Sequence, residues 1–390
     1  MAHRAFTKFL IYSQDGLGLG HLRRNVNICY QIKKRCPQAS CLIIADSPVA
    51  PFFRLPPHCD FIKIPTLVKV DTGIWRSDRL HMNDRELLGI RSEIIRNVIL
   101  SFRPEVFLVD HMPHGALGEL VEPLHTFRKF CPGSKLILGL RDILGAPEVI
   151  RQQWQREGAF DAITAYYDAV HIYGSAEFFD AVNEYDFPQA LRAKTHYCGY
   201  VCREATPGHA PAGMIKDDEK FVLITGGGGA DAAYFMDRFI DAVQRLDSQK
   251  KLRAFIATGP FVHQEQCDLL ARKSRGLPIQ VGRMAGDSIR FLRRADLVIS
   301  MAGYNTVSEI MCFRKNAIVV PRAGPSAEQT MRTRIMSGRG LFGSIHPHDL
   351  TADNLAELIV QKLANGSSMN ETMLPPLAGA SQVASLLLTT

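Results

Sequence analysis

The chain has 390 residues, of which 46% are hydrophobic and 22% charged, a composition typical of a soluble globular protein large enough for two domains. Its apolar runs are far shorter than the roughly 20 residues that span a bilayer, and residues 1–10 lack the apolar region of a signal peptide, so we expect a cytoplasmic protein. The net charge of +7 is spread along the chain and indicates no nucleic-acid partner, while nine cysteines without a Cys-x-x-Cys pair favour neither a disulfide framework nor a structural zinc site.

Short apolar runs alternate with helix-length stretches along the chain. In the first half, the strand-like runs are residues 9–13, 41–45, 61–64, 106–110, 136–140 and 170–173. In the second half, they are residues 221–225, 254–257, 279–281, 297–300 and 317–320. This βα rhythm is typical of parallel sheets covered by helices, so we predict an α/β protein with two doubly wound, Rossmann-like domains.

The domain boundary is expected just after residue 202. Residues 203–213 are rich in Pro, Gly and Ala, as in a linker. We therefore predict an N-terminal, acceptor-side domain over residues 1–202, a linker over 203–218 and a C-terminal domain over 219–374. The tail, residues 375–390, is apolar from residue 378 and is expected to form a helix that packs back on the N-terminal domain.

Ligands of open α/β sheets bind beyond the carboxyl ends of the strands, so the loops that leave the strands are the candidate sites. The loop after the first predicted strand contains Gly16, Gly18 and Gly20, which permit close backbone approach to an acceptor or a phosphate, and it ends at His21. Its spacing misses the dinucleotide pattern G-x-G-x-x-G, but Asp46 at the end of the second strand keeps a dinucleotide site as a minor alternative.

The loop after the first strand of the second domain contains Gly226, Gly227 and Gly228. Its place at the binding edge predicts contact with a diphosphate or an acceptor. The alternative is a plain flexible turn, because glycine often marks turns.

A strand, a glycine turn and a helix start follow one another at residues 297–310. Gly303 and Tyr304 form the turn, and Asn305 or Thr306 is expected to cap a helix whose first N–H groups have no partner within the helix. Such a helix end binds phosphate. Glu309 lies one turn further along and is suited to the two neighbouring hydroxyls of a ribose.

Glu328 and Gln329 stand at the start of the helix after the next strand, where they offer acceptors and donors to the hydroxyls of a hexose. The alternative is an acid that stabilises its own helix as part of a capping box with Ser326. The nucleotide site expected nearby favours sugar binding.

Residues 301–309, Pro321 with Arg322, Glu328 with Gln329, and the helix end at 334–341 together resemble the donor site of GT-B glycosyltransferases. The likeness is to family 28, the group of peptidoglycan-lipid N-acetylglucosaminyltransferases and diacylglycerol glycosyltransferases. It implies two domains facing across a cleft and a nucleoside-diphosphate-sugar donor, UDP being the expected nucleotide.

The resemblance also implies a role for each matching residue. Gly303, Tyr304, Asn305 and Thr306 would meet the diphosphate, Glu309 the ribose, and Glu328 with Gln329 the sugar. Arg283 and Met284 would line the base through their backbone, and the glycines at 226–229 would face the diphosphate or the acceptor. Ala302, Tyr304 and Arg283 depart from the residues usual in the family, which leaves the base open.

The expected mechanism is inversion without a metal ion or other cofactor. No Asp-x-Asp pair occurs in the chain, and a helix end can stabilise a departing diphosphate without metal. Position 317, eight residues beyond Glu309, is alanine, where retaining GT-B enzymes carry a second glutamate. His21 is the candidate general base and Asp110 its orienting partner, while His111 and His114 are alternatives for either role.

The acceptor is hardly encoded, and a glycan, a lipid and a small molecule all stay open. Residues 85–103 mix aliphatic side chains with arginines, as in a helix at the inner face of a membrane, but an ordinary helix packed on the sheet is favoured. The leading hypothesis is an inverting hexosyltransferase. A nucleotide-sugar epimerase or hydrolase on the same fold, and a non-catalytic nucleotide-sugar-binding subunit, are the alternatives.

Overall fold

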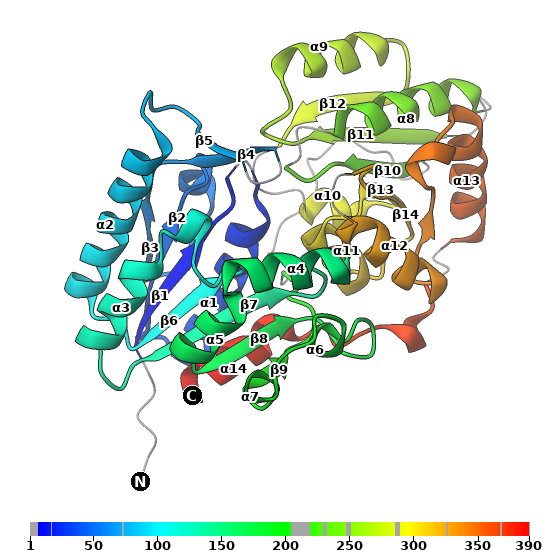
Figure 1. The fold of residues 1–390 in the computed structure, drawn as a ribbon. Coiled ribbons are helices and arrows are strands. Elements are labelled where there is room, and N and C mark those ends of the chain that lie inside the picture. The colour runs from blue at the N-terminus through cyan, green and yellow to red at the C-terminus, as the bar shows by residue number, and fades with distance from the viewer. Residues whose placement is uncertain are drawn as a thin grey trace. The chain divides into compact units, whose positions relative to one another are not determined.

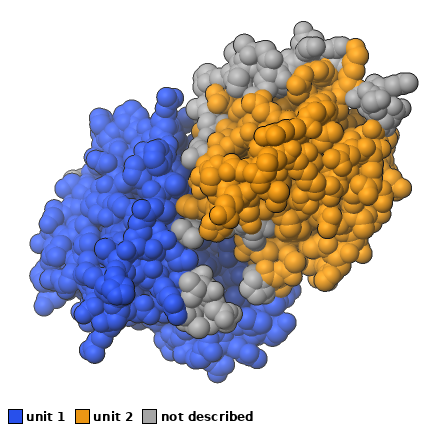
Figure 2. All heavy atoms as spheres, turned by 90° about the horizontal axis from the view of Figure 1, so that it is seen from above, with its two compact units in different colours: residues 1–202, 378–390 blue, residues 203–377 orange. Residues whose placement is uncertain are grey.

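The computed structural model describes residues 7–16, 18–71, 74–203, 219–228, 232–246, 251–284, 289–324, 327–366 and 369–389. The chain forms two compact units, which we call unit 1 (residues 1–202 with 378–390) and unit 2 (residues 203–377) (Figures 1 and 2). Each unit holds a parallel sheet with connecting helices, so the predicted α/β class with two doubly wound domains is confirmed. Residues 204–218 of the predicted linker lie outside the described residues.

Unit 1 is built on a seven-stranded parallel sheet with the order β3-β2-β1-β6-β7-β8-β9. Its strands are β1 (Lys8–Ser13), β2 (Ser40–Ala45), β3 (Cys59–Lys63), β6 (Val106–Asp110), β7 (Lys135–Arg141), β8 (Ala169–Tyr173) and β9 (Thr195–Tyr197). A separate antiparallel hairpin, which the sequence patterns do not predict, consists of β4 (Leu67–Asp71) and β5 (Ile74–Ser77). The central strands β1, β6 and β8 are mostly apolar and, apart from Lys8 at the start of β1, buried, as in sheets covered on both faces.

The helices of unit 1 are α1 (Gly20–Arg35), α2 (Asp84–Phe102), α3 (Val121–Phe130), α4 (Pro147–Glu157), α5 (Ala159–Tyr166), α6 (Ala181–Glu184), α7 (Gln189–Arg192) and α14 (Gly379–Thr389). The tail helix α14 packs against α1, at the other end of the chain. Gly379 makes this return possible, because a Cβ at that position would lie only 2.4 Å from the carbonyl oxygen of Gly199. The backbone N–H of Gly379 donates to the carbonyl of Tyr200 at 3.0 Å.

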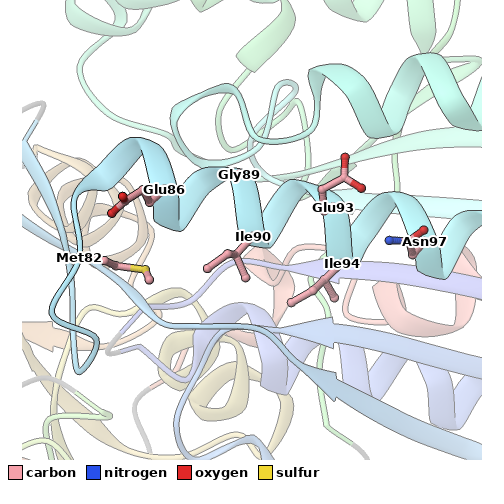
Figure 3. Close-up of a pocket in the computed structure, with 7 residues that line it drawn as sticks. All are labelled: Met82, Glu86, Gly89, Ile90, Glu93, Ile94 and Asn97. Carbon is pink, nitrogen blue, oxygen red and sulfur yellow. The ribbon is translucent and has the colours of Figure 1, made fainter.

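Helix α2 is an ordinary amphipathic helix of the unit. A capping box between Asn83 and Glu86 starts it, and every fourth residue from Leu87 to Ile99 is buried. Its other side forms a shallow groove (Figure 3). The groove is lined by Met82, Glu86, Gly89, Ile90, Glu93, Ile94 and Asn97. Two carboxylates and no basic side chain line this groove, which is not the chemistry of a face attracted to anionic lipid. None of the described helices is long and apolar enough to cross a membrane.

Unit 2 is built on a six-stranded parallel sheet with the order β12-β11-β10-β13-β14-β15. Its strands are β10 (Lys220–Thr225), β11 (Leu252–Thr258), β12 (Ile279–Arg283), β13 (Leu297–Met301), β14 (Ala317–Val320) and β15 (Gly343–Ser344). Its helices are α8 (Ala233–Arg245), α9 (Gln264–Lys273), α10 (Ile289–Arg294), α11 (Tyr304–Cys312), α12 (Glu328–Gly338) and α13 (Ala352–Asn365). One apolar core joins the sheet to α8 and α13.

Both sheets reverse their winding direction at one point. Strand β1 pairs with β2 on one side and with β6 on the other, and β10 pairs likewise with β11 and β13. In doubly wound sheets a crevice opens at such a point, outside the carboxyl ends of the strands, because successive connections leave toward opposite faces. The loops after β1 and β6, and those after β10 and β13, therefore flank the two positions where ligands are expected.

Candidate functional site

The switch point of unit 1 brings His21 and Asp110 together. Asp110 is the last residue of β6 and lies in register with Ser13, the last residue of β1. His21 follows in the first turn of α1. The His21 Nδ1 atom lies 3.2 Å from Asp110 Oδ2, and the Asp110 carboxylate is fully buried while 15% of the His21 side chain is exposed. The two candidate catalytic residues thus form a hydrogen-bonded pair whose histidine reaches solvent.

Asp110 is held as a carboxylate by its other partners. Arg24 Nη2 donates to both of its oxygens at 2.8 Å, and Asn25 Nδ2 donates to Oδ2 at 3.1 Å. Burial alone would raise the pKa of Asp110, but Arg24 and His21 outweigh it and leave the pKa well below its usual range. The carboxylate is therefore charged at neutral pH and can accept a hydrogen bond from the Nδ1–H group of His21.

Two tautomers of His21 compete at this pair. Arg24 Nη2 lies 2.8 Å from the same Nδ1 and can only donate, which favours a bare Nδ1. The Asp110 carboxylate can only accept, which favours a protonated Nδ1. In the second tautomer the Nε2 atom carries the lone pair, and this is the form that a general base requires.

The glycine loop of unit 1 is folded onto carboxylates of the chain itself. Asp15 accepts the first N–H groups of α1, from His21 at 2.8 Å and Leu22 at 2.6 Å. Asp46, which kept a dinucleotide site as a minor alternative, is buried and accepts hydrogen bonds from the N–H groups of Asp15 at 2.8 Å and Gly16 at 3.0 Å. These contacts fix His21 at the end of the loop. A contact of Gly16, Gly18 or Gly20 with an acceptor stays a prediction.

The alternative histidines are placed differently. The ring of His111 lies 5.2 Å from that of His21, but burial and the nearby Arg141 hold its pKa well below the usual value. Burial also lowers the pKa of His114. Within the described part of the chain, neither belongs to a group of three metal-ligating side chains. His111 is therefore a neutral neighbour of His21.

The switch point of unit 2 carries the start of helix α11. Gly303 is the N-cap residue, with φ −63° and ψ 140°, and no side chain caps the helix or places an acid in its first turn. The expectation that Asn305 or Thr306 caps the helix is wrong, because both lie within the first turn. A Cβ on Gly303 would meet no atom within 4 Å. The start of α11 at the carboxyl edge of the sheet is thus formed by backbone groups, without a side-chain cap.

The loop after β10 lies against this helix start. Gly227 adopts a left-handed backbone, with φ +68°, and its N–H donates to Thr225 Oγ1 at 3.2 Å. A Cβ on Gly227 would lie 3.9 Å from Thr306 Oγ1, and one on Gly259 would lie 2.4 Å from the Gly227 carbonyl. Gly226 and Gly228 flank this residue. The glycines therefore let two loops approach at the switch point, next to the first turn of α11.

Glu309 and Glu328 are both largely buried in unit 2. Glu328 is the first residue of α12 and pairs through Oε1 with Arg332 Nη1 at 2.9 Å. The same Arg332 atom donates to the carbonyl of Ala302 at 2.9 Å, and its guanidinium lies 5.7 Å from the centre of the Tyr304 ring. Arg332 therefore ties the predicted sugar-binding acid to the start of α11. We did not predict it, although the i,i+4 spacing of Glu328 and Arg332 signals such a pair.

The remaining predicted residues lie at the same edge of the sheet of unit 2. Gln329 Oε1 accepts the backbone N–H of Arg322 at 3.0 Å, which orients its amide at the start of α12. Arg283 Nη2 donates to the carbonyl of Val262 at 2.7 Å, so this side chain is bound within unit 2. The N–H of Met284 donates to the carbonyl of Thr258 at 2.9 Å. Gly229 and Ser326 lie outside the described residues.

Sequence comparison finds a family match in the second half of the chain. Residues 221–384 match the glycosyltransferase family 28 C-terminal domain. Similar curated proteins are the UDP-N-acetylglucosamine--N-acetylmuramyl-(pentapeptide) pyrophosphoryl-undecaprenol N-acetylglucosamine transferases. That of Sinorhizobium medicae is 27% identical over 201 residues, 50% of this chain and 51% of the relative. That of Brucella abortus (strain S19) is 29% identical over 191 residues, 47% of each. The chain thus spans about half the length of the curated relatives it matches.

Structure comparison extends over nearly the whole chain. MurG of Acinetobacter baumannii has a TM-score of 0.59 at 16% identity, covering 98% of this chain and 100% of that one. A Listeria monocytogenes protein described as a UDP-N-acetylglucosamine 2-epimerase has a TM-score of 0.61 at 12% identity, covering 98% and 91%. At these identities the likeness shows the fold, which is GT-B. The resemblance to family-28 GT-B glycosyltransferases is confirmed.

Proposed function

We propose that this chain, whose C-terminal half carries the family 28 domain, is a glycosyltransferase that moves a hexose-type sugar from a nucleoside diphosphate to an acceptor hydroxyl, with inversion and without a metal ion. One observation carries the proposal. Helix α11 begins with a glycine and no side-chain cap at the switch point of a sheet, where a phosphate is expected. UDP is the proposed nucleotide, since the curated relatives are named for a UDP-sugar donor.

The donor is assigned to unit 2. The backbone of Tyr304, Asn305 and Thr306 would hold the pyrophosphate, because the first amides and the positive dipole end of a helix attract anions. Glu309, five residues after the first residue of the helix, would accept hydrogen bonds from the two ribose hydroxyls. The loop at Gly227 would contact the pyrophosphate from the neighbouring strand, since a Cβ on Gly227 would lie 3.9 Å from Thr306 Oγ1 in the first turn of the same helix.

The sugar is assigned to the start of α12. A carboxylate has about four lone-pair sites, so the pairing of Glu328 with Arg332 is compatible with further hydrogen bonds to sugar hydroxyls. The bond from the Arg322 N–H fixes the oxygen of the Gln329 amide, which directs its donor group away from that contact. Both residues would recognise hydroxyls of a hexose, and Arg332 would hold Glu328 in place.

The chemical step is assigned to His21. Its Nε2 atom would take the proton from the acceptor hydroxyl while the hydroxyl oxygen attacks the anomeric carbon and the bond from that carbon to the diphosphate oxygen breaks. The charged Asp110 would stabilise the imidazolium that forms. The departing diphosphate gains negative charge, which the positive end of α11 would stabilise. A single displacement of this kind inverts the anomeric configuration.

Two experiments test the proposal. Thermal stabilisation by a panel of nucleoside diphosphates identifies the nucleobase of the donor, and UDP is expected to raise the melting temperature most. Transfer from UDP-N-acetylglucosamine is then followed with EDTA present, and NMR of the product reads the anomeric configuration. We expect an inverted product and no loss of rate in EDTA. A retained configuration, or a rate abolished by EDTA and restored by Mg²⁺, would contradict the mechanism.

The acceptor class is the least defined part of the proposal. The curated relatives are named for a pyrophosphoryl-undecaprenol acceptor, so a polyprenyl-pyrophosphate sugar is the first acceptor to test, ahead of free glycans and small molecules. Such an acceptor would also imply peripheral contact with a membrane. Co-sedimentation of the protein with vesicles that contain the lipid, compared with vesicles that lack it, tests this contact.

A second candidate function has one observation in its favour. The Listeria protein described as a UDP-N-acetylglucosamine 2-epimerase shares the fold. An epimerase or hydrolase would turn over the donor in the absence of any acceptor. We expect acceptor-free turnover to be far slower than transfer. Fast conversion of the UDP-sugar alone would favour the second candidate, and tight UDP binding with no turnover under any condition would indicate a binding subunit.

A further inference from the structure

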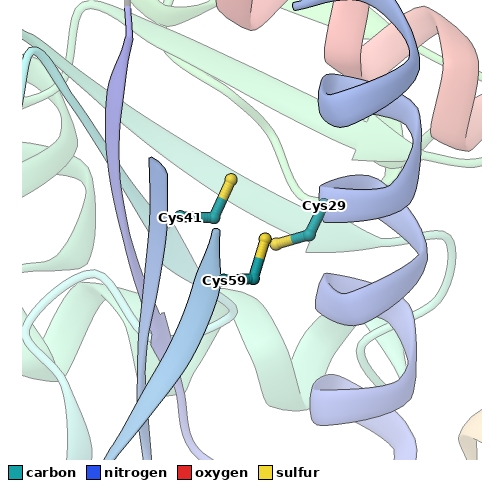
Figure 4. Close-up of side chains that lie close together, drawn as sticks. All are labelled: Cys29, Cys41 and Cys59. Carbon is teal, nitrogen blue, oxygen red and sulfur yellow. The ribbon is translucent and has the colours of Figure 1, made fainter. Parts of the chain in front are cut away.

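Three of the nine cysteines converge in unit 1. Cys29 is on α1, Cys41 on β2 and Cys59 on β3, and their sulfur atoms all lie within 4.8 Å of one another (Figure 4). Cys41 and Cys59 are register partners on adjacent parallel strands, so their side chains point to the same face of the sheet. Helix α1 covers that face and contributes the third sulfur. They sit at the amino ends of β2 and β3, whereas His21 and Asp110 lie at the carboxyl edge.

The cluster is reachable from solvent through one of its three cysteines. Cys29 and Cys41 are buried, while Cys59, on the edge strand β3, is partly exposed. A metal ion could therefore reach the cluster from solvent at Cys59. Lys33 Nζ is held nearby by the carbonyl of Ala39 at 2.7 Å and by His58 Nδ1 at 3.0 Å. The thiolate, and not the thiol, is the form of cysteine that binds metal ions, so metal binding would release the protons of the cluster.

We propose that Cys29, Cys41 and Cys59 form a binding site for a soft, thiophilic metal ion that accepts three sulfur ligands, with Cu(I) as its representative. This inference is independent of the proposed transferase activity. Thiolates select soft ions, whereas Mg²⁺ and Ca²⁺ bind oxygen ligands. Structural zinc takes four ligands, and no further His, Cys, Asp or Glu joins this group among the described residues. Three sulfurs on one sheet face and its covering helix suit a three-coordinate ion.

The test is competition for Cu(I) between the reduced, full-length protein and bathocuproine disulfonate under anaerobic conditions. We expect one equivalent of Cu(I) to be withdrawn from the chelator. Cys29→Ser, Cys41→Ser and Cys59→Ser should each weaken binding by at least about 10-fold, which is the smaller end of what an outer-shell change costs a metal site. Cys312→Ser is the matched control, because Cys312 is also partly exposed but lies in unit 2. It should bind as the wild type does.

A second measurement needs no variant and so does not depend on the variants folding. Alkylation by iodoacetamide, read by mass spectrometry, should label Cys59 in the metal-free protein and be blocked there by one equivalent of Cu(I), with labelling of Cys312 unchanged. The proposal is overturned if Cu(I) fails to protect Cys59, or if the three cluster variants bind Cu(I) as the wild type does. Preferential retention of Zn²⁺ over Cu(I), or a disulfide within the cluster of anaerobically isolated protein, would also overturn it.

Discussion

Replacing Asp110 by asparagine should damage both the stability and the catalysis of the protein. The fully buried carboxylate accepts from Arg24 at 2.8 Å on both oxygens, from Asn25 at 3.1 Å, and lies 3.2 Å from His21 Nδ1. Asparagine keeps the shape but loses the charge, and it presents an N–H₂ donor where only donors approach. Arg24, with 2% of its side chain exposed, then loses the carboxylate with which it is paired.

The magnitudes follow from that environment. Removing one partner of a buried ion pair costs about 3–5 kcal/mol of the free energy of unfolding. Loss of the acceptor that holds the base-competent tautomer of His21 should lower kcat by about 10²–10⁴-fold, the usual contribution of general base catalysis. The KM for the donor should change little, because the proposed donor-binding residues are in unit 2.

A double variant separates the two effects. In Arg24→Met/Asp110→Asn both charges are gone, so most of the lost stability should return, whereas kcat should stay low because the orienting carboxylate is missing. Urea denaturation gives the free energy of unfolding, and initial rates of UDP release in the presence of acceptor give kcat and KM. The reasoning is refuted if the folded single variant keeps the wild-type kcat, or if the double variant regains it. Asp110 would then serve only to neutralise Arg24.

Three further changes give separate readouts. Glu309→Gln should raise the donor KM by roughly 10-fold or more, with a smaller effect on kcat, because a charged acceptor for ribose hydroxyls is lost; an unchanged KM in steady-state kinetics would remove Glu309 from the donor site. Burial raises the pKa of Asp46 from 3.8 to about 6, so ionisation of this carboxyl costs the folded protein up to about 3 kcal/mol. The free energy of unfolding of the wild type, relative to that of Asp46→Asn, should therefore fall as pH rises from about 4 to 7. Denaturation curves that keep a constant difference between the two proteins over this range would contradict the assignment. Arg332→Gln should lower the free energy of unfolding by about 3–5 kcal/mol and raise the donor KM, because the buried Glu328 loses the guanidinium of Arg332. Equal stability by urea titration and an equal donor KM would show that Arg332 does not position Glu328.

The parallel strands were predictable because burial on both faces makes them continuous apolar runs. The predicted strand at 106–110 coincides with β6, and that at 317–320 with β14. The hairpin β4–β5 was missed because it mixes charged and apolar residues, and β15 because two residues carry no periodicity. Local pattern thus identifies the longer strands of the parallel sheets, including the partly exposed edge strands β3 and β12, and fails for the short β9 and β15 and for the hairpin.

The candidate site was predictable as far as strand order places loops at one edge. His21 and Asp110 were expected together because each ends or follows a strand that meets the switch point. The roles of Arg24 and Asp15 could not be predicted, because a charged side chain in a helix or loop usually faces solvent, and only the folded contacts show which atoms it neutralises or caps. The cysteine cluster was not predicted either, because its three members come from three different elements and only the fold brings them together.

The central claim is that the first amides of α11 hold a pyrophosphate, and calorimetric binding of UDP to two variants at one position tests it most directly. Tyr304 is the first helical residue, where proline fits the backbone but removes the N–H. Tyr304→Pro and Tyr304→Ala both lose the ring, and only the first loses the donor. We predict that UDP binds Tyr304→Pro roughly 10-fold or more weakly than Tyr304→Ala, since a hydrogen bond to a charged group is lost, and that the two variants bind uridine alike. Equal UDP affinity of two folded variants would contradict the account.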